Sequence, residues 1–320
     1  MKTDKPVQSA LWANINATYL TEDKLRDLSN FKSSGINFKI ALWNPHTNGV
    51  RYLKALIYNL SASLTDENWE ILKRIRNRNL GKPFSITYRG EPVCLDYLQA
   101  VYELSFVAEH LSLDGMKILE IGAGYGRTCH AFLSNHDISD YVIIDLPNCL
   151  KLSSSYLQKV LEKNQFDKVR FVPIDDLDVL QSDTFDLCIN IDSFAEMEPG
   201  TVAYYLNIIN MTCRTFYVKN PVGKYADPTL STDRKENEVD LALETGLLQE
   251  VLDIHDSDDV NFRVPSFIDT YRPGAEWSCI ADSWAPPWSF YWQALYAREG
   301  TKAYTTLENS IPKSILKVQQ

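Results

Sequence analysis

The sequence predicts an α/β protein, in which a mainly helical N-terminal section precedes a doubly wound, Rossmann-like sheet. From about residue 110 onward, short apolar runs alternate with amphipathic helical patterns, which is typical of parallel strands joined by crossover helices. One of these runs, 117–121, leads into three alternating glycines and a helix start, as in sheets that bind a ligand where a strand ends. The first 110 residues show helical patterns instead. We therefore expect two domains, 1–110 and 111–320.

The sheet domain is expected to contain five apolar strands in chain order. They are KILEI (117–121), YVIID (141–145), VRFVPI (169–174), FDLCINI (185–191) and CRTFYVKN (213–220). Helices are predicted between them over 125–134, 148–163 and 201–210. After residue 220 the chain becomes more polar, and we expect one helix around 237–251 followed by an acidic loop.

Two helices are predicted in the N-terminal domain. The segment 64–79 has acidic residues in its first turn, basic residues in its last turn and Gly81 just beyond, which matches the helix dipole and a helix stop. The segment 94–111 is apolar around most of its circumference, so we expect a buried helix. No Pro, Gly or Ser linker follows, and this predicts that the section packs against the sheet domain.

Composition narrows the classes of function. The formal charge is -10 at pH 7, from 42 acidic and 32 basic side chains, which is unfavourable for gathering nucleic-acid phosphates. The six cysteines form no CxxC pair and no metal-finger spacing, so we expect reduced thiols that pack as small hydrophobes. No stretch approaches the roughly 18 apolar residues of a membrane span. These features predict a cytoplasmic protein with no nucleic-acid and no membrane partner.

The segment KILEIGAGYGRT (117–128) carries glycines that let a ligand approach the main chain closely. A dinucleotide site would need a glycine at position 127, where this chain has Arg127. The pattern E-x-G-x-G-x-G instead resembles the first motif of the class I S-adenosylmethionine-dependent methyltransferases. The resemblance implies that Glu120 helps to hold the amino group of S-adenosylmethionine. It also implies that the cofactor lies against the loop residues Gly122, Ala123, Gly124, Tyr125 and Gly126.

A carboxylate follows the second predicted strand where an adenosine ribose would need one. Such folds bind the ribose hydroxyls with an acid about 20 residues after the glycines. Asp145 stands in that place, 19 residues after the last glycine, and Leu146 follows it. By resemblance, Asp175 or Asp176 after the third strand is expected to bond the adenine amino group, with solvated loop acids as the alternative. Asn190, in the fourth strand, completes the predicted cofactor-binding residues.

Transfer of a methyl group to a hydroxyl is an in-line displacement, and the hydroxyl proton must be removed by a positioned base or with the help of a metal. Asp192 and Glu196 follow the fourth strand, where ligands of open α/β sheets bind, and we expect at least one of them to act. Ser193 is a nearby substrate-binding donor. The alternatives are a turn cap for Asp192 and a solvent-exposed position for Glu196.

His255 is a third candidate base, because histidine titrates near neutral pH. The acids at 256, 258 and 259 lie beside it and would supply oxygen ligands for Mg²⁺. An exposed acidic loop is the alternative. The sequence therefore leaves the metal requirement open.

Four segments together resemble the bacterial sugar O-methyltransferase family over roughly residues 85–295: EIGAGYGRT, YVIIDLPNCL, FDLCINIDSFAEM and FYVKNP. The NPPY-like tetrad, which adenine and amide nitrogen methyltransferases of this superfamily carry, is absent here. The resemblance implies methyl transfer from S-adenosylmethionine to a hydroxyl of a sugar or glycosylated small molecule, with S-adenosylhomocysteine as product. Trp284 is expected to contact the acceptor, while most aromatic residues near it fill the core of two last strands.

Three alternatives stay open. A phenolic or other natural-product hydroxyl is the second acceptor class, because DLP also occurs in O-methyltransferases that act on phenols. A non-catalytic S-adenosylmethionine-binding scaffold is the alternative outside the enzyme classes, and a nicotinamide dehydrogenase is disfavoured by Arg127. The N-terminal helices would serve as a lid, as a pocket wall or as the interface of a homodimer.

Overall fold

We describe a computed structural model of the chain, in which residues 9–21, 26, 31–180, 183–227, 230 and 236–301 are described. The chain divides into two compact units, residues 1–59 and 60–320. The first unit contains α1 (Ala10–Thr18), the short 3-10 helix η1 (Phe31–Ser33), α3 (Asn37–Ile40) and the first part of α4 (Gly49–Ser63). All further elements belong to the second unit, which carries the site.

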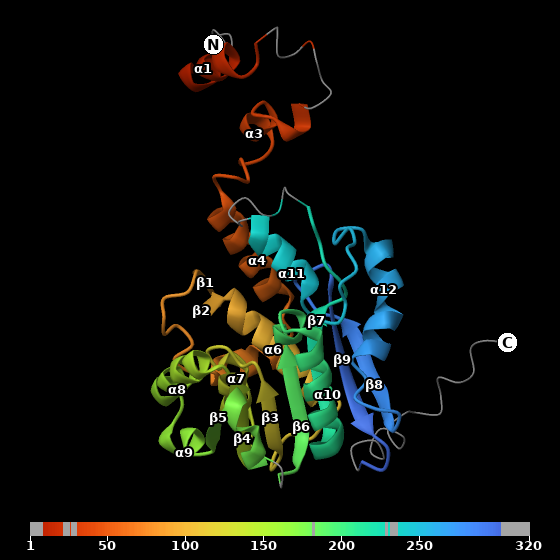
Figure 1. Cartoon of the computed structure of the whole chain (residues 1–320). Coiled ribbons are helices and arrows are strands. Elements are labelled where there is room, and N and C mark those ends of the chain that lie inside the picture. Colours follow the sequence, from red (N-terminus) through yellow and green to blue (C-terminus); the bar gives the residue numbers. More distant parts are fainter. Residues whose placement is uncertain are drawn as a thin grey trace, which may run out of the picture. The chain divides into compact units, whose positions relative to one another are not determined.

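The second unit is built on a seven-stranded sheet with the order β5-β4-β3-β6-β7-β9-β8 (Figure 1). The strands β3 to β7 are parallel, and the hairpin of β8 and β9 joins them through an antiparallel pairing of β9 with β7. The predicted doubly wound α/β fold is confirmed. The strand bounds are β3 (Lys117–Ile121), β4 (Asp140–Asp145), β5 (Val169–Pro173), β6 (Phe185–Ile191), β7 (Cys213–Pro221), β8 (Trp277–Trp284) and β9 (Tyr291–Arg298).

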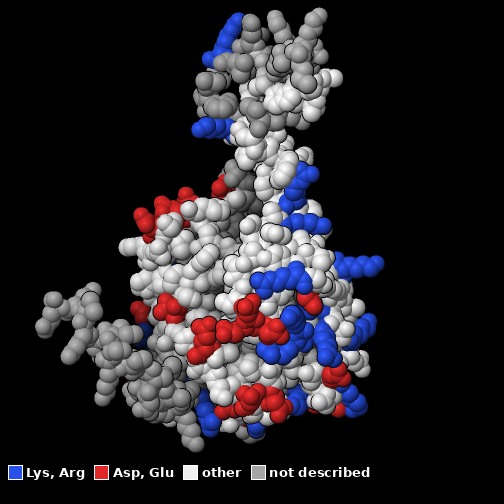
Figure 2. Space-filling model, turned by 180° about the vertical axis from the view of Figure 1, so that it is seen from behind, with Lys and Arg blue, Asp and Glu red and all other residues white. Residues whose placement is uncertain are grey.

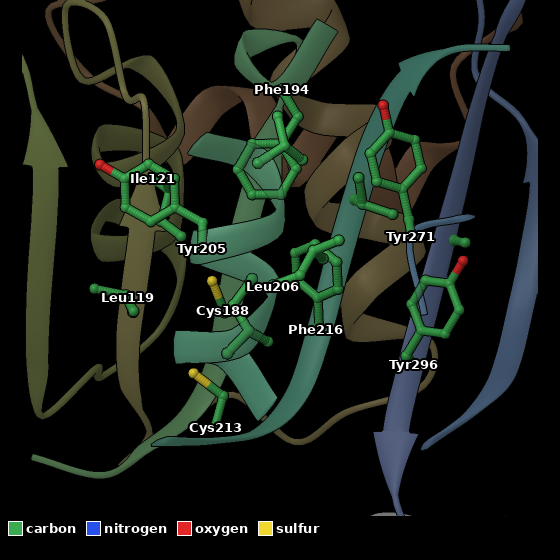
Figure 3. Packing of buried hydrophobic residues seen from close by; sticks show 14 of the residues in the cluster. Leu119, Ile121, Cys188, Phe194, Tyr205, Leu206, Cys213, Phe216, Tyr271 and Tyr296 are labelled. Atoms are coloured by element: carbon green, nitrogen blue, oxygen red, sulfur yellow. The ribbon is translucent and has the colours of Figure 1, made fainter. Parts of the chain in front are cut away.

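Helices cover both faces of the sheet because successive strand residues point to opposite sides. On one face, Ile118 of β3 packs with residues of α6 (Leu95–Ala108), α7 (Arg127–Asn135) and α8 (Pro147–Val160). On the other face, Leu119 and Ile121 pack with α10 (Pro199–Thr212) and α12 (Ser257–Thr270). Figure 3 shows the second cluster, in which aromatic side chains fill the space between sheet and helices. The last two strands contribute aromatic core residues here, such as Tyr296.

Local sequence signals explain where several helices begin. The Thr65 hydroxyl accepts a hydrogen bond from the Asn68 N–H at 3.2 Å and so caps α5 (Asp66–Arg74), which starts with acids and ends with bases as the sequence predicts. Proline at the first turn starts both α8 and α10, since its missing N–H needs no partner there. A short helix, α9 (Lys163–Phe166), follows α8.

Several elements differ from the sequence expectations, and α4 and α12 were not predicted as helices. The strands β1 (Ser85–Tyr88) and β2 (Glu91–Cys94) form a hairpin that the helical interpretation missed. The helix α11 (Glu236–Glu244) ends earlier than predicted, shortly before Gly246, whose φ is +71°. The acidic stretch around residue 256 is not a loop, because Asp256 caps α12 by accepting from the Asp258 N–H at 2.9 Å.

The carboxyl ends of β3 and β6 meet at the point where the strand order reverses. In open α/β sheets ligands bind at this switch point. The glycine loop follows β3, and the 3-10 turn η3 (Ser193–Ala195) follows β6, so both predicted functional segments lie at this edge. Within the described part of the chain, no helix combines the length and the apolar composition needed to cross a membrane.

Candidate active site

A cavity of about 370 Å³ opens at the switch point of the sheet. Its walls come from the start of α6, the end of β3 with the glycine loop, the ends of β6 and β7, and the loop before β9. The predicted site residues Glu120, Gly122, Ala123, Gly124, Tyr125 and Asp192 line it. A larger cavity of about 610 Å³ lies around Met116, Cys213 and Arg214, and no predicted site residue lines it.

The three glycines of the loop have different environments. All three have positive φ, between +59° and +91°, which L side chains rarely adopt. A Cβ at Gly122 would overlap the Ser193 side chain, and a Cβ at Gly126 would press against Leu157 at 2.9 Å. A Cβ at Gly124 would meet nothing within 4 Å. Close packing within the protein therefore explains why positions 122 and 126 have glycine. Gly124 instead faces open space that a ligand can enter.

Asp145 lies against this loop. Its carboxylate accepts hydrogen bonds from the N–H of Gly124 at 2.9 Å and from the N–H of Leu146 at 2.7 Å. The Leu146 side chain is 54% exposed, which is unusual for an apolar residue at the end of a buried strand. In the sheet register Asp145 pairs with Pro173, so the exposed Asp175 and the neighbouring Asp176 follow at the adjacent strand end. The predicted ribose and adenine carboxylates thus share one edge.

Glu120 is buried in the wall of the cavity, with 2% of its surface exposed. The Tyr141 hydroxyl donates a hydrogen bond to its carboxylate at 2.8 Å. Burial raises the pKa of Glu120 to about 7, although the hydrogen bonds from Tyr141 and Thr128 act in the opposite direction. A cation in the cavity would favour the ionised form of this carboxyl group.

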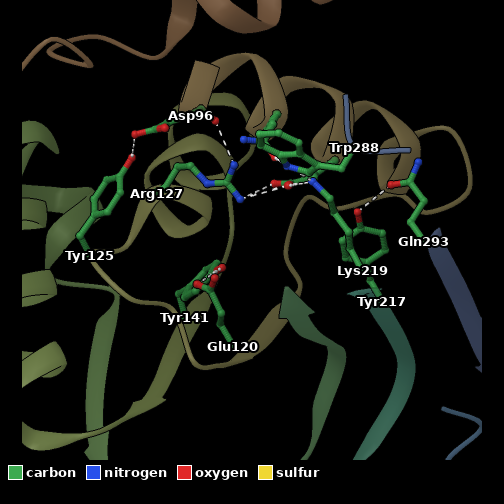
Figure 4. A network of polar contacts seen from close by, with 11 residues as sticks. Asp96, Glu120, Tyr125, Arg127, Tyr141, Tyr217, Lys219, Trp288 and Gln293 are labelled. Carbon is green, nitrogen blue, oxygen red and sulfur yellow. Dashed lines mark hydrogen bonds and ion pairs between the residues drawn. The ribbon is translucent and has the colours of Figure 1, made fainter. Parts of the chain in front are cut away.

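Arg127, which breaks the dinucleotide spacing, takes part in a buried ion network (Figure 4). Its guanidinium donates to both carboxylate oxygens of Glu103, at 3.0 and 2.9 Å, and to the Asp96 carbonyl at 2.9 Å. The Lys219 ammonium donates to Glu103 at 2.8 Å and to Gln99 at 3.3 Å. Burial raises the pKa of Glu103, but the two cations outweigh this and hold it below its usual value.

The same network fixes the glycine loop to α6. The Tyr125 hydroxyl donates to the Asp96 carboxylate at 3.2 Å, and the Tyr125 ring meets Tyr156 edge-on with centroids 5.0 Å apart. Sequence reasoning missed Asp96, Gln99, Glu103 and Lys219 as site residues. One signal in the sequence could have revealed this network: Glu103 is a charged residue inside a helix that is predicted to be buried, and a buried charge needs a partner of opposite charge.

The turn after β6 carries the predicted catalytic residues. Asp192 lines the cavity and accepts a hydrogen bond from the Tyr291 hydroxyl at 2.6 Å. Glu196, at the other end of the turn, is exposed and is not part of the cavity wall. Ser193 donates to the Ile121 carbonyl at 3.1 Å, and Asn190 is fully buried and donates to the same carbonyl at 3.0 Å. Asn190 and Ser193 therefore tie the turn to the end of β3, and neither residue lines the cavity.

The other predicted residues lie outside the cavity wall: Gly126, Asp145, Leu146, Asp175, Asp176, Asn190, Ser193, Glu196, His255 and Trp284. His255 is exposed in the segment before α12, and the neighbouring Asp259 accepts a hydrogen bond from the Asp253 N–H at 3.0 Å. Trp284 is 48% exposed and donates to the Trp288 carbonyl at 2.7 Å. Trp288, not Trp284, lines the cavity, and its indole N–H donates to Gln99 at 3.1 Å. The tryptophan that lines the cavity is thus Trp288, four positions after the predicted Trp284.

No metal centre is evident in the described ranges, where no group of three or more His, Cys, Asp or Glu side chains is arranged to hold an ion. The acids around His255 are engaged in the start of α12 instead.

Comparison with known proteins finds distant structural similarities alone. No protein-family model and no curated protein matches the chain. A Thermoplasma acidophilum protein, 1320, is 9% identical, with a TM-score of 0.43 over 74% of this chain and 100% of that one. A SAM-dependent methyltransferase from Aquifex aeolicus is 10% identical, with a TM-score of 0.40 over 63% and 92%. The glycopeptide N-methyltransferase MtfA, complexed with sinefungin, is 13% identical, with a TM-score of 0.42 over 62% and 94%.

At these TM-scores the similarities carry no argument about fold or function. The fold is established by the strand order itself, in which a parallel sheet reverses at β3 and β6 and ends in an antiparallel hairpin. This is the doubly wound, Rossmann-like sheet that the sequence predicts.

Proposed function

We propose that this protein is an S-adenosylmethionine-dependent methyltransferase that acts on a hydroxyl of a sugar or glycosylated small molecule and releases S-adenosylhomocysteine. The observation that carries the proposal is that Gly124 and Glu120 line one cavity, while the Asp145 carboxylate, outside the cavity wall, accepts a hydrogen bond from the Gly124 N–H. Gly124 presents its backbone to open space, Asp145 lies beside it, and Glu120 lines the cavity wall. A cofactor with a ribose and an amino-acid group would use all three.

The residues present fit S-adenosylmethionine group by group. Asp145 would accept hydrogen bonds from the ribose hydroxyls, because its carboxylate can accept more hydrogen bonds than those from the two backbone N–H groups and the Cys149 thiol. Leu146 and Ile174, 54% and 37% exposed at adjacent strand ends, would contact the two faces of adenine. Asp175 or Asp176 would accept from its amino group.

The amino-acid portion of the cofactor would lie deeper in the cavity. Glu120 would pair with its ammonium group, which offsets the burial of the carboxylate. The carboxylate of the cofactor would face the side of Arg127 and Lys219, whose positive charges also attract Glu103 and Asp96. The bound cofactor supplies an electrophilic methyl group, and the protein has to align an acceptor with it and remove a proton.

The mouth of the cavity supports a polyhydroxylated acceptor. Asp96, Gln99 and Asp192 offer carboxylate and amide groups, and Trp288, which is 39% exposed, offers an aromatic face. Sugars present many hydroxyl groups together with an apolar C–H face, so this combination suits them better than it suits a flat phenol. The phenolic acceptor is therefore our second choice.

The charge of the protein supports a small acceptor over a polyanion. The net charge is -10, and many basic side chains are paired, as in Lys168 with Asp137 and Arg170 with Asp140. Figure 2 shows acidic side chains next to basic ones over the lower part of the face that it presents. A polyanion would meet repulsion there as well as attraction.

Methyl transfer from tritium-labelled S-adenosylmethionine tests the proposal directly. The acceptors are a mixture of nucleoside diphosphate sugars and glycosides in one assay and a mixture of catechols and flavonoids in another. We expect labelled product and S-adenosylhomocysteine from the sugars. Transfer to phenols alone would contradict the acceptor class. A folded chain that binds S-adenosylmethionine but has no acceptor-sized space beside Asp192 in its cofactor complex would support the scaffold alternative.

A further inference from the structure

Asp192 has an unusual backbone conformation. Its φ is 68° and its ψ is -36°, a region that glycine adopts far more readily than residues with a side chain. Such strain persists only where the surrounding structure holds it, and it is concentrated at functional sites.

The turn is held by groups other than the Asp192 side chain. The Asp192 N–H donates to the Lys219 carbonyl at 2.8 Å, and the Ala195 N–H donates to Asn220 at 3.3 Å. The Ala195 carbonyl accepts from the Lys224 ammonium at 2.8 Å and from the Thr245 hydroxyl at 2.9 Å. A glycine at position 192 would keep all of these bonds and would relieve the strain.

The carboxylate of Asp192 has one hydrogen-bond partner among the described residues, the Tyr291 hydroxyl at 2.6 Å, and it also attracts the Lys224 ammonium electrostatically. Both residues line the cavity that holds the glycine loop. Burial, and then the neighbouring Asp192, raise the pKa of Tyr291 above its usual value, so the phenol stays protonated and donates. Because Tyr291 occupies one carboxylate oxygen, the other oxygen is left to accept a proton from a molecule in the cavity.

We infer that Asp192 is the general base that takes the proton of the acceptor hydroxyl and that Tyr291 is the residue that positions it. This inference rests on the proposed function. As the acceptor oxygen forms its bond to the methyl carbon, the proton passes to Asp192, and the electron pair of the broken carbon–sulfur bond stays on sulfur. The products are a methyl ether and a neutral thioether, so charge and atoms balance.

The two other predicted bases fit this role less well. Glu196 is exposed at the far end of the turn, and His255 is exposed before α12, and neither lines the cavity. Asp192 is the one of the three that faces the same space as Gly124.

Sinefungin tests the inference without a known acceptor. This analogue carries an amino group at the position of the methyl group that is transferred, so its ammonium ion reports on a carboxylate facing that position. We expect the native chain to bind sinefungin roughly tenfold more tightly than S-adenosylhomocysteine in calorimetry, as one charge-assisted hydrogen bond would give. In Asp192→Asn this preference should disappear while the Kd for S-adenosylhomocysteine stays within about threefold.

Tyr291→Phe and a matched control complete the series. Tyr291→Phe should reduce the preference for sinefungin over S-adenosylhomocysteine by about fivefold, as the loss of one orienting hydrogen bond would do. The control is Asp282→Asn, because Asp282 accepts a 2.8 Å hydrogen bond from the Trp292 indole on the same hairpin but lies outside the cavity wall. Its preference for sinefungin should equal that of the native chain.

Thermal unfolding separates a role in binding from a role in folding. Asp192→Gly should unfold at the same or a higher temperature than the native chain and should still lose the preference for sinefungin. A lower unfolding temperature would show that the carboxylate serves the fold. An unchanged preference in Asp192→Asn, or its loss in Glu196→Gln instead, would overturn the inference. Failure of the native chain to bind S-adenosylhomocysteine would overturn the proposed function itself, which the same titrations distinguish.

Discussion

The backbone N–H of Gly124 donates a 2.9 Å hydrogen bond to the carboxylate of Asp145, 21 residues further along the chain. This bond joins the glycine loop after β3 to the end of β4. It brings together the two sequence features from which a cofactor site was predicted. A ligand that contacts the open side of Gly124 would therefore also be within reach of Asp145.

The glycines of the loop should respond differently to substitution by alanine. At Gly124 an alanine meets open space, so its cost is the positive φ alone, roughly 1–2 kcal/mol. The methyl group would occupy space in which the cofactor is proposed to lie, so we expect a folded protein with at least tenfold weaker S-adenosylhomocysteine binding in calorimetry.

Gly122→Ala is the matched comparison. Its Cβ overlaps the Ser193 side chain, so we expect a larger loss of stability in urea unfolding, about 3 kcal/mol from strain and overpacking together. Equal stability of the two variants, or unchanged ligand affinity in Gly124→Ala, would contradict the assignment of Gly124 to the ligand.

Cofactor binding should release a proton near neutral pH. In the empty protein the pKa of Glu120 is about 7, because the carboxyl group is buried. An ammonium group beside it favours the carboxylate and lowers this pKa, so affinity should increase as the pH rises from about 5 to about 8. Calorimetry of S-adenosylhomocysteine in buffers of different ionisation enthalpy measures the proton released.

Glu120→Gln is the control for this linkage, and binding to this variant should release no such proton. Because the folded pKa of Glu120 lies above its ordinary value of 4.5, the folded protein binds the extra proton between about pH 4.5 and 7. Native stability should therefore fall by roughly 3 kcal/mol as the pH rises through this window, and Glu120→Gln should lack that fall. The same pH dependence in both proteins would exclude Glu120 as its source.

The ion network should be essential to the fold. Glu103→Gln leaves the cations of Arg127 and Lys219 without their shared anion, in side chains that are 15% and 2% exposed. We expect a loss of about 3–5 kcal/mol in the free energy of unfolding, measured with urea. Glu109→Gln, at the exposed end of the same helix, should change it by no more than about 0.5 kcal/mol. A comparable effect of both substitutions would mean that the network contributes little.

The sheet could be predicted because its signals are local. The apolar runs of β3 and β6 have the bounds that the sequence indicates, and each is followed by a segment that lies at the switch point. The hairpin of β1 and β2 could not be found in this way, since its strands have four residues each and turn at Arg89 and Gly90 instead of a typical Asn-Gly pair.

The site could be predicted only in part because several of its contacts join distant residues. Arg127 meets Glu103 over 24 positions, and Lys219 meets Glu103 over 116, so no spacing rule connects them. The geometry of the hairpin of β8 and β9 determines which tryptophan reaches the cavity. The alternation of apolar and polar residues in the sequence does not distinguish Trp288 from Trp284. Asp192 was a candidate from its place after β6, but its partner Tyr291 lies 99 residues away.

The affinity of the native chain and of Asp145→Ala for S-adenosylhomocysteine tests the central claim most directly. Calorimetry should give micromolar binding to the native chain and at least tenfold weaker binding to the variant. Asp140→Ala, at the other end of β4, should bind as the native chain does, because its carboxylate pairs with Arg170 away from the cavity. Absence of binding by the folded native chain, or equal binding by Asp145→Ala, would contradict the account.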